Sequence, residues 1–373
     1  MTASVDSPAM DVTDDSALEA RKYLASRLAT KSTETSFRSI PVIDVQSSFS
    51  GTNEDRQAIA KQIHEACTTV GFFYITGHGM EETCNATLKL AKRFFNEVPE
   101  SSKEAIHIKT SKYFRGWEPA SFSSVDVLET KNPAKETKEA FNWGYEAGLD
   151  PTGGDGKYVE LDGAVPDSKA NLWPSEDAIP GFYQGISEYY GSTLQLCRHL
   201  CRLFALSLDL PEFFFNPMIT HPGGIARLIK YKASENPQPL SFSIEDQEIG
   251  LGAHSDYECF TLLLQDSVPG LEILSPDGHW ISATPIQGGI VVNVADFLMR
   301  WTNGVYKSTV HRVINRTAEE RYSIPLFFSI NYDEKVETLP SCISEDNPAK
   351  FPPITAGKYV LDRLAATVLG GYQ

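Results

Sequence analysis

The stretch "AHSDYECFTLLLQD", residues 253–266, places a histidine and an aspartate two positions apart, just before an apolar run. Side chains two residues apart in a β-strand project from the same face. We therefore expect His254 and Asp256 to point together while Ser255 points away. The run that follows, residues 260–265, has the composition of a buried strand. The stretch thus predicts two metal-ligand side chains that converge at the mouth of a β-structure.

A third candidate ligand, His311, lies in "KSTVHRVINR", residues 307–316, a strand-like segment expected beside the first one. Two imidazoles and one carboxylate form a facial triad, which leaves coordination positions open. Such a triad suits Fe(II) that binds a chelating cosubstrate together with oxygen. A His-x-Asp pair alone occurs by chance in many chains, so this interpretation depends on the residues that accompany it.

The accompanying residues are in "RYSI", residues 321–324. Arg321 and Ser323 share a strand face and offer a guanidinium with a hydroxyl beside it, a pair that binds carboxylates well. A keto acid with a second, distal carboxylate would bridge the metal and Arg321. Alone, Arg321 would be read as one half of a surface ion pair; beside the triad, the carboxylate site is the preferred interpretation.

Short strands separated by turn signals fill the chain from about residue 225 onward, which indicates an antiparallel sandwich or barrel such as a jelly roll. Upstream, the patterns predict strands at 40–46 and 71–79, and helices at 55–70, 81–106 and 181–208. Residues 110–185 are rich in Gly, Pro, Asp and Lys and are expected to form long ordered loops. The fold class is therefore mixed α/β and mainly β.

Composition excludes several classes of protein. The 33 Lys and Arg against 49 Asp and Glu give a formal charge of -16, which repels phosphate backbones and argues against a nucleic-acid partner. No stretch approaches the roughly 18 consecutive apolar residues of a spanning helix. The N-terminus lacks the basic and apolar regions of a secretion signal. We expect a cytoplasmic protein without a membrane partner, a monomer or weak homodimer, whose six cysteines are reduced.

The sequence resembles the iron- and 2-oxoglutarate-dependent dioxygenases, and more narrowly the isopenicillin N synthase-like branch. The resemblance rests on the order His254-x-Asp256, His311, Arg321-x-Ser323, and it covers most of the chain. "IPVIDV" and "GFFYITGHG" are similar to the N-terminal region of that branch, "YFRGW" and "KEAFNWG" to its middle segment. "HSDYECFTLLLQDSVPGLEIL", "GGIVVNVADFLMRWTNGVYKSTVHRV" and "RYSIPLFF" resemble its catalytic core.

The resemblance implies a double-stranded β-helix (jelly-roll) core with flanking helices, and a site that uses Fe(II), 2-oxoglutarate and O2. It implies that His254, Asp256 and His311 hold iron, and that Arg321 and Ser323 bind the distal carboxylate of 2-oxoglutarate. Tyr231 occupies the position of a further hydrogen-bonding tyrosine in many members. The chain departs from the family pattern around it, with Ile229 before and Lys232 after the tyrosine. Asn293 and Asp296 also match the family and are interpreted as turn and hydrogen-bonding residues.

The expected domain organisation is a flexible acidic tail with a possible helix at 1–36, followed by one catalytic domain at 37–373. Within that domain we distinguish an N-terminal dioxygenase region at 37–150, the jelly-roll core at 222–332 and a C-terminal helical segment at 333–373. Aromatic residues at the expected barrel mouth are the candidates for binding a mid-sized, largely apolar substrate. They are Phe114, Trp117, Phe141, Trp143, Phe260, Phe327 and Tyr332.

The predicted activity is oxidation of a small organic molecule in microbial secondary metabolism by hydroxylation, desaturation or cyclisation, with release of succinate and CO2. The nearer alternative is an oxidase of the isopenicillin N synthase kind, which would use the same triad without 2-oxoglutarate. Arg321 and Ser323 would then bind the substrate's own carboxylate. A more distant alternative is a non-catalytic protein that binds a small molecule.

Overall fold

The structure is a computed structural model that describes residues 36–120, 122, 137–166, 170–235, 237 and 250–368. The acidic tail predicted for residues 1–36 lies outside the described residues, except for residue 36. Within the described residues, no helix is both long enough and apolar enough to cross a bilayer. All six cysteines are described, and each is buried as a free thiol, as expected from the sequence.

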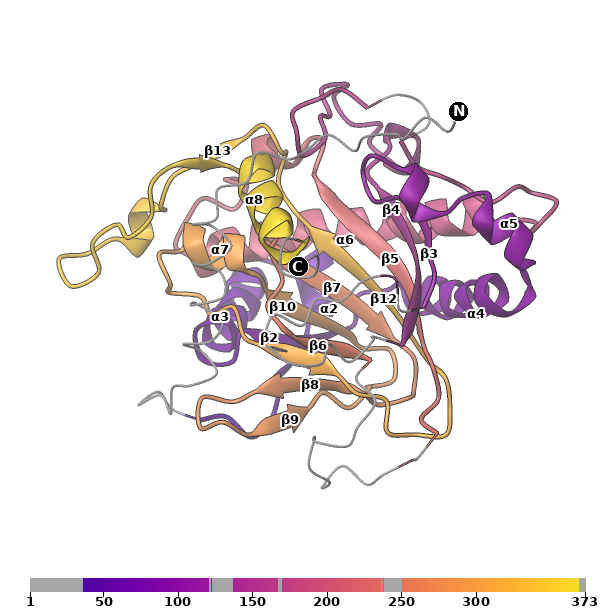
Figure 1. The fold of residues 1–373 in the computed structure, drawn as a ribbon. Helices are drawn as coiled ribbons and strands as arrows, with labels where there is room; N and C mark the ends of the chain where they lie inside the picture. The colour runs from indigo at the N-terminus through magenta and orange to yellow at the C-terminus, as the bar shows by residue number, and fades with distance from the viewer. Residues whose placement is uncertain are drawn as a thin grey trace.

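The larger of two facing sheets has eight strands and forms the centre of the molecule (Figure 1). Only β1 and β2 pair in parallel; the other neighbours are antiparallel. In spatial order the strands are β1 (Val42–Asp44), β2 (Phe72–Thr76), β10 (Ile290–Val294), β7 (Phe260–Gln265), β12 (Arg321–Phe328), β5 (Gly224–Tyr231), β4 (Lys138–Gly144) and β3 (Gly116–Glu118).

The smaller sheet has four strands: β6 (Leu251–His254), β11 (His311–Val313), β8 (Leu271–Leu274) and β9 (Trp280–Ser282). Its apolar face packs on one face of the larger sheet. The shared core includes Phe72 and Tyr231 from the larger sheet and Ile273 and Val313 from the smaller one. We call this sheet-to-sheet face of the larger sheet its inner face. A separate hairpin pairs β13 (Lys335–Val336) with β14 (Ile354–Thr355).

The outer face of the larger sheet is covered by helices, because its alternate residues are also apolar. Phe94 of α4 (Glu81–Glu97), for example, packs on Phe141 of β4 with ring centroids 5.0 Å apart. α6 (Phe182–Ser207) and α3 (Asn53–Thr69) pack in the same core, and α3 begins at a capping box formed by Thr52 and Asp55. Shorter helices are α2 (Gln46–Ser50), α5 (Glu100–Glu104) and α7 (Asp296–Trp301).

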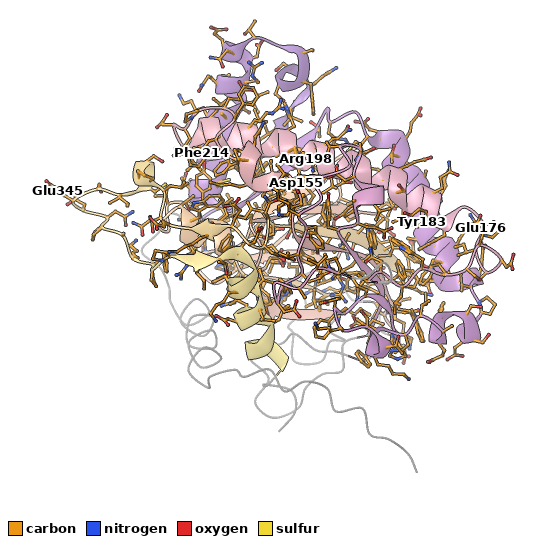
Figure 2. All side chains as sticks on the ribbon, turned by 90° about the horizontal axis from the view of Figure 1, so that it is seen from above. Asp155, Glu176, Tyr183, Arg198, Phe214 and Glu345 are labelled. Atoms are coloured by element: carbon orange, nitrogen blue, oxygen red, sulfur yellow. The ribbon has the colours of Figure 1, made fainter. Side chains whose placement is uncertain are left out.

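The last helix, α8 (Ala356–Val368), lies on the opposite side of the sheets from α6. Figure 2 shows this arrangement, with Arg198 labelled on α6. Arg198 binds Asp150 through two hydrogen bonds of 2.8 and 2.6 Å, which fasten the segment after β4 to α6. The chain reaches α8 only after the β13–β14 hairpin, so the C-terminal segment predicted as helical also contains strands.

Two strands occur where long loops were predicted. β3 and β4, within residues 110–185, extend the larger sheet beyond β5. Six of the seven residues of β4 are buried, and Lys138 and Asn142 lie on the same face as Ala140. Because both faces of β4 are covered and one carries buried polar residues, the strand lacks the alternation of apolar and polar residues that would reveal it.

Candidate active site

Two histidines face each other across neighbouring strands of the smaller sheet. His254 ends β6 and pairs directly with His311, which begins β11. Their ring centroids are 4.3 Å apart. The antiparallel register therefore brings together two imidazoles that are far apart in the sequence, in the space between the two sheets.

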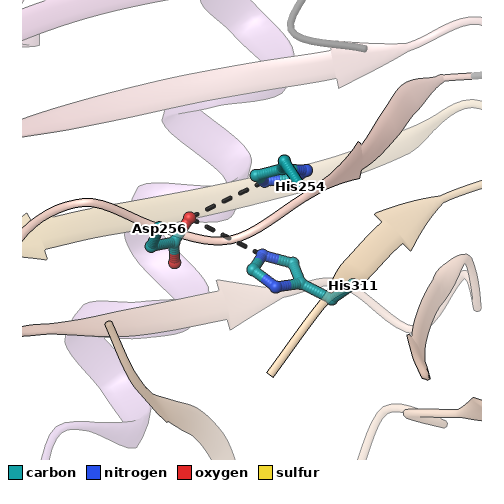
Figure 3. Close-up of side chains that lie close together, drawn as sticks. All are labelled: His254, Asp256 and His311. Atoms are coloured by element: carbon teal, nitrogen blue, oxygen red, sulfur yellow. Dashed lines mark ion pairs between the residues drawn. The ribbon is translucent and has the colours of Figure 1, made fainter. Parts of the chain in front are cut away.

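Asp256 completes the group from the turn that follows β6. Its Oδ1 lies 3.6 Å from Nε2 of His254 and 3.6 Å from Nε2 of His311 (Figure 3). The ligand atoms of all three residues lie within 4.8 Å of one another. The expectation that a continuous strand would aim His254 and Asp256 together is wrong in one detail, because β6 ends at His254 and the turn aims the carboxylate.

Nδ1 of each histidine is hydrogen-bonded to a backbone carbonyl oxygen. Nδ1 of His254 donates to the carbonyl oxygen of Gly252 over 2.7 Å, and Nδ1 of His311 donates to that of Thr309 over 3.1 Å. Each hydrogen bond fixes the orientation of its ring and leaves Nε2 as the nitrogen with a lone pair. Both Nε2 atoms face Oδ1 of Asp256, as a metal site requires.

The second oxygen of Asp256 is held by two polar side chains of the larger sheet. Oδ2 accepts a hydrogen bond of 2.6 Å from Thr261 on β7 and one of 2.8 Å from Asn293 on β10. Thr261 and Asn293 are directly opposite each other in the sheet. The two donors occupy Oδ2 and turn Oδ1 toward the histidines. Sequence reasoning missed Thr261, although it shares a strand face with residues that line the space between the sheets.

Burial and mutual charge set the protonation of the three groups. Burial, together with the neighbouring His311, lowers the pKa of His254 to about 4. Burial alone would raise the pKa of Asp256, but the two histidines and Thr261 hold it well below its usual range. Burial also opposes the charge on His311, yet the carboxylate of Asp256 raises the pKa of that imidazole. The site is thus arranged to keep a carboxylate anion between two imidazoles.

The turn that carries Asp256 contacts Asp296 of α7 and Arg363 of the C-terminal helix α8. The backbone N–H of Asp296 donates to the carbonyl oxygen of Asp256 over 2.9 Å, and Oδ2 of Asp296 accepts a hydrogen bond of 3.0 Å from Ser255. The same Oδ2 lies 2.7 Å from Nη2 of Arg363 on α8. Arg363 also stacks over the ring of Tyr257 at 4.8 Å. α8 therefore anchors both residues that flank Asp256.

Arg321 is a fully buried cation whose hydrogen-bonding capacity is only partly used. It lies opposite Tyr231 in the sheet, with its guanidinium 5.0 Å from the centre of that ring. Nη2 donates to Gln265 over 3.0 Å, while Nε and Nη1 have no hydrogen-bond partner among the described residues. Ser323 is buried two residues along the same strand face. Buried polar nitrogens without partners are costly, and these fit an anion such as a carboxylate.

The seven aromatic candidates occupy three different environments. Phe114 is exposed in the turn before β3, at a positive φ of 57°. Phe327 lies opposite Thr261, on the inner face. Tyr332 is buried beyond β12, where its hydroxyl donates to Glu258 over 3.1 Å. The other four belong to the core that includes the helices: Trp117, Phe141, Trp143 and Phe260. The structure does not gather the seven around the triad.

Comparisons with known proteins identify the family to which a chain with this site belongs. Residues 225–330 match the family model of the 2OG-Fe(II) oxygenase superfamily, and residues 40–176 match that of the N-terminal region of non-haem dioxygenases in morphine synthesis. A relative from Emericella nidulans, the 2-oxoglutarate-Fe(II) type oxidoreductase hxnY, is 37% identical over 84% of this chain and 86% of its own. The chain belongs to the 2OG-Fe(II) oxygenase superfamily.

Other relatives of this oxygenase give the same result. The 2-oxoglutarate-Fe(II) type oxidoreductase ppzC of Metarhizium majus is 32% identical over 87% of this chain and 86% of the relative. Among solved structures, a full-length Neurospora crassa protein in complex with alpha-KG and thymine superimposes with a TM-score of 0.73. The two chains are 28% identical, and the match covers 91% of this oxygenase and 99% of the Neurospora chain.

The protein is therefore an oxidoreductase that uses Fe(II), 2-oxoglutarate and O2 to oxidise a small molecule. The family membership expected from the sequence is confirmed, and the relatives do not favour the oxidase that dispenses with 2-oxoglutarate. The likeness to solved 2-oxoglutarate oxygenases also confirms the mainly β, sheet-rich α/β class.

Proposed function

We propose that His254, Asp256 and His311 hold the iron of this oxygenase. The observation that carries this proposal is the convergence of three ligand atoms within 4.8 Å, with Nε2 of each histidine directed at the carboxylate. Two neutral imidazoles and one carboxylate are the donor set that suits an open Fe(II) site. Thr261 and Asn293 keep Asp256 in position by hydrogen bonds to its other oxygen.

Arg321, Ser323 and Tyr231 are the proposed binding site for the distal carboxylate of 2-oxoglutarate. The two partnerless nitrogens of the buried Arg321 support this role, because a carboxylate would satisfy both. When bound, iron supplies the chemistry that couples oxidative decarboxylation of 2-oxoglutarate, to succinate and CO2, with oxidation of a C–H bond. The side chains of His254, Asp256 and His311 are at most 12% exposed, which limits their contact with bulk water.

The proposed substrate site lies between the two sheets, with Phe327 as a lining residue next to Thr261. The two facing sheets support a double-stranded β-helix core at residues 222–332, with 37–150 and 333–373 completing one catalytic domain. A solved relative that binds thymine together with alpha-KG supports a small organic substrate beside the keto acid. Fungal relatives support a role in microbial secondary metabolism. A cytoplasmic location and a monomeric or weakly dimeric state stay predictions from the sequence.

Fe(II) binding by single-site variants tests the assignment of the ligands. Without oxygen, the protein should compete with a chromophoric chelator for one Fe(II) per chain. We expect His311→Ala to lose more affinity than the roughly 10–100-fold that follows from removing a hydrogen-bonding partner of a ligand. His279→Ala is the matched control, because this histidine is 65% exposed and pairs with Asp277 instead. Equal Fe(II) affinity in the two variants would contradict the assignment.

A further inference from the structure

A group of charged and polar side chains lies on the inner face of β3, β4 and β5, outside the residues assigned above. We call it the polar wall; it consists of Glu118, Lys138, Asn142 and Arg227. Nη2 of Arg227 lies 2.5 Å from Glu118, and Nε of Arg227 donates to Asn142 over 2.7 Å. Lys138 lies 3.6 Å from the other oxygen of Glu118. Glu118, Lys138 and Asn142 are at most 4% exposed as side chains or residues, so these contacts form in the interior.

The polar wall faces the same space as the candidate iron and 2-oxoglutarate sites. On β5, Arg227 lies midway between Ile225 and Ile229, which oppose Phe327 and Ser323 on β12. Because side chains alternate along a strand, Arg227 shares the face of Ile229 and Tyr231, which pack between the sheets. At the other end of the wall, Lys138 lies directly opposite Tyr231 in the β4–β5 pair, so this end of the wall borders the proposed 2-oxoglutarate site.

Lys138 borders the 2-oxoglutarate site, but the position of Arg227 separates it from that site. Arg321 and Tyr231 occupy one end of the inner face, while Arg227 is four residues along β5 toward Phe327. Four residues of strand span roughly 13 Å, so Arg227 and Arg321 belong to different levels of the sheet. A keto acid held at Arg321 therefore leaves Arg227 for a second ligand.

The hydrogen bonding of Arg227 favours an acidic ligand. Glu118 and Asn142 engage two nitrogens of Arg227, and its Nη1 donates to no described residue. The side chain of Arg227 keeps 18% of its surface accessible, unlike the rest of the wall. Glu118 and Asn142 thus orient a guanidinium whose remaining edge can bind a carboxylate.

We propose that the substrate is a small organic acid whose carboxylate binds Arg227. This inference rests on the proposed function and names its substrate class. Asn142 and Glu118 act as positioning residues that hold the guanidinium, and Lys138 adds positive charge at the far end of the wall. The carboxylate anchors the substrate on β5, so that another carbon of the same molecule reaches the triad and is oxidised while the carboxylate is retained.

Ligand binding to the intact chain, loaded with Fe(II) and 2-oxoglutarate without oxygen, tests this proposal. The probes are benzoate, phenylacetate and cinnamate, each compared by calorimetry with its primary amide. An amide keeps the size and shape of the acid but loses its charge. At least one acid should bind about tenfold or more tightly than its amide. That preference should fall to less than about twofold in Arg227→Gln and recover in part in Arg227→Lys.

A control variant and a measurement of 2-oxoglutarate affinity distinguish failure of this proposal from failure of the proposed function. Arg93→Gln is the matched control, since Arg93 is 42% exposed on α4 and pairs only with Glu97 among the described residues; it should keep the wild-type preference. The affinity for 2-oxoglutarate, measured first in each sample, should not change in Arg227→Gln. If 2-oxoglutarate binds but no acid exceeds its amide, or if the preference survives in Arg227→Gln, the acidic-substrate proposal is overturned. Failure of 2-oxoglutarate to bind the wild-type chain would instead overturn the proposed function.

Discussion

Asn293 donates a hydrogen bond to Asp256, with its Nδ2 2.8 Å from the Oδ2 atom that faces away from the histidines. This contact joins a central strand of the larger sheet to the turn after β6. Together with Thr261 it decides which oxygen of Asp256 faces the metal site. The geometry of the triad therefore depends on residues that do not belong to it.

Replacing Asn293 tests that dependence. We expect Asn293→Ala to lower Fe(II) affinity by roughly 10–100-fold, because the carboxylate loses one of the two donors that hold it. Chelator competition without oxygen measures the effect. Asn96→Ala, on the exposed side of α4, is the control and should bind Fe(II) as the wild type does. Unchanged affinity in Asn293→Ala would mean that Thr261 alone fixes Asp256.

Arg321 should govern 2-oxoglutarate binding without affecting iron. In Arg321→Gln, two charge-assisted hydrogen bonds to the distal carboxylate are lost, which corresponds to a decrease in affinity of about 100-fold. Equilibrium binding of 2-oxoglutarate to the Fe(II)-loaded protein measures it. Arg38→Gln, at an exposed pair with Asp277, should leave the affinity unchanged. If both variants bind 2-oxoglutarate equally well, the cosubstrate's carboxylate must bind elsewhere.

The C-terminal helix should support the iron site through Arg363. Arg363→Met leaves the buried carboxylate of Asp296 without its cation, 2.7 Å away in the wild type. We predict a lower melting temperature and an Fe(II) affinity reduced by about tenfold. Lys358→Met is a matched control on the same helix, since Lys358 is 64% exposed and pairs with Asp362. A melting temperature that falls without any change in Fe(II) affinity would limit Arg363 to a structural role.

The Arg198–Asp150 pair should make stability depend on pH. Burial opposes the charge on Asp150, but the hydrogen bonds from Arg198 lower its pKa below the usual 3.8. A lowered pKa in the folded state contributes stability above about pH 4, and this contribution disappears as the pH falls through the lower value. Asp150→Asn should therefore destabilise the protein by about 3 kcal/mol at pH 7.

The same substitution should cost progressively less below pH 4. Denaturant unfolding at pH 7 and at pH 3 measures both values. A destabilisation of equal size at the two pH values would show that the loss comes from packing and not from the ion pair.

The three candidate iron ligands can be predicted from the sequence because each lies in a short segment with a recognisable pattern. His254 and Asp256 are two residues apart, and His311 lies in a segment with strand composition. The prediction that a strand carries both His254 and Asp256 fails because the strand ends at His254. The turn is fixed by contacts with Thr261, Asn293 and Asp296, all from other elements.

The polar wall could not be found in the same way. Lys138 meets Glu118 across an antiparallel pair of strands in a region whose composition indicates loops. Buried charges on the inner face of β4 remove the apolar and polar alternation by which strands are recognised. Arg227 alone had a local signal, since it lies four residues before Tyr231 and so shares its face. The support from Arg363 depends on the packing of α8, which no local pattern indicates.

The central claim is that the triad and Arg321 form one site for Fe(II) and 2-oxoglutarate. The most direct test is an anaerobic titration of the Fe(II)-loaded protein with 2-oxoglutarate, followed by the weak visible band of a chelated keto acid. The band should appear with one equivalent of Fe(II), be absent from Asp256→Ala, and require much more 2-oxoglutarate in Arg321→Gln. A band of the same strength in Asp256→Ala, at the same concentrations, would contradict the claim.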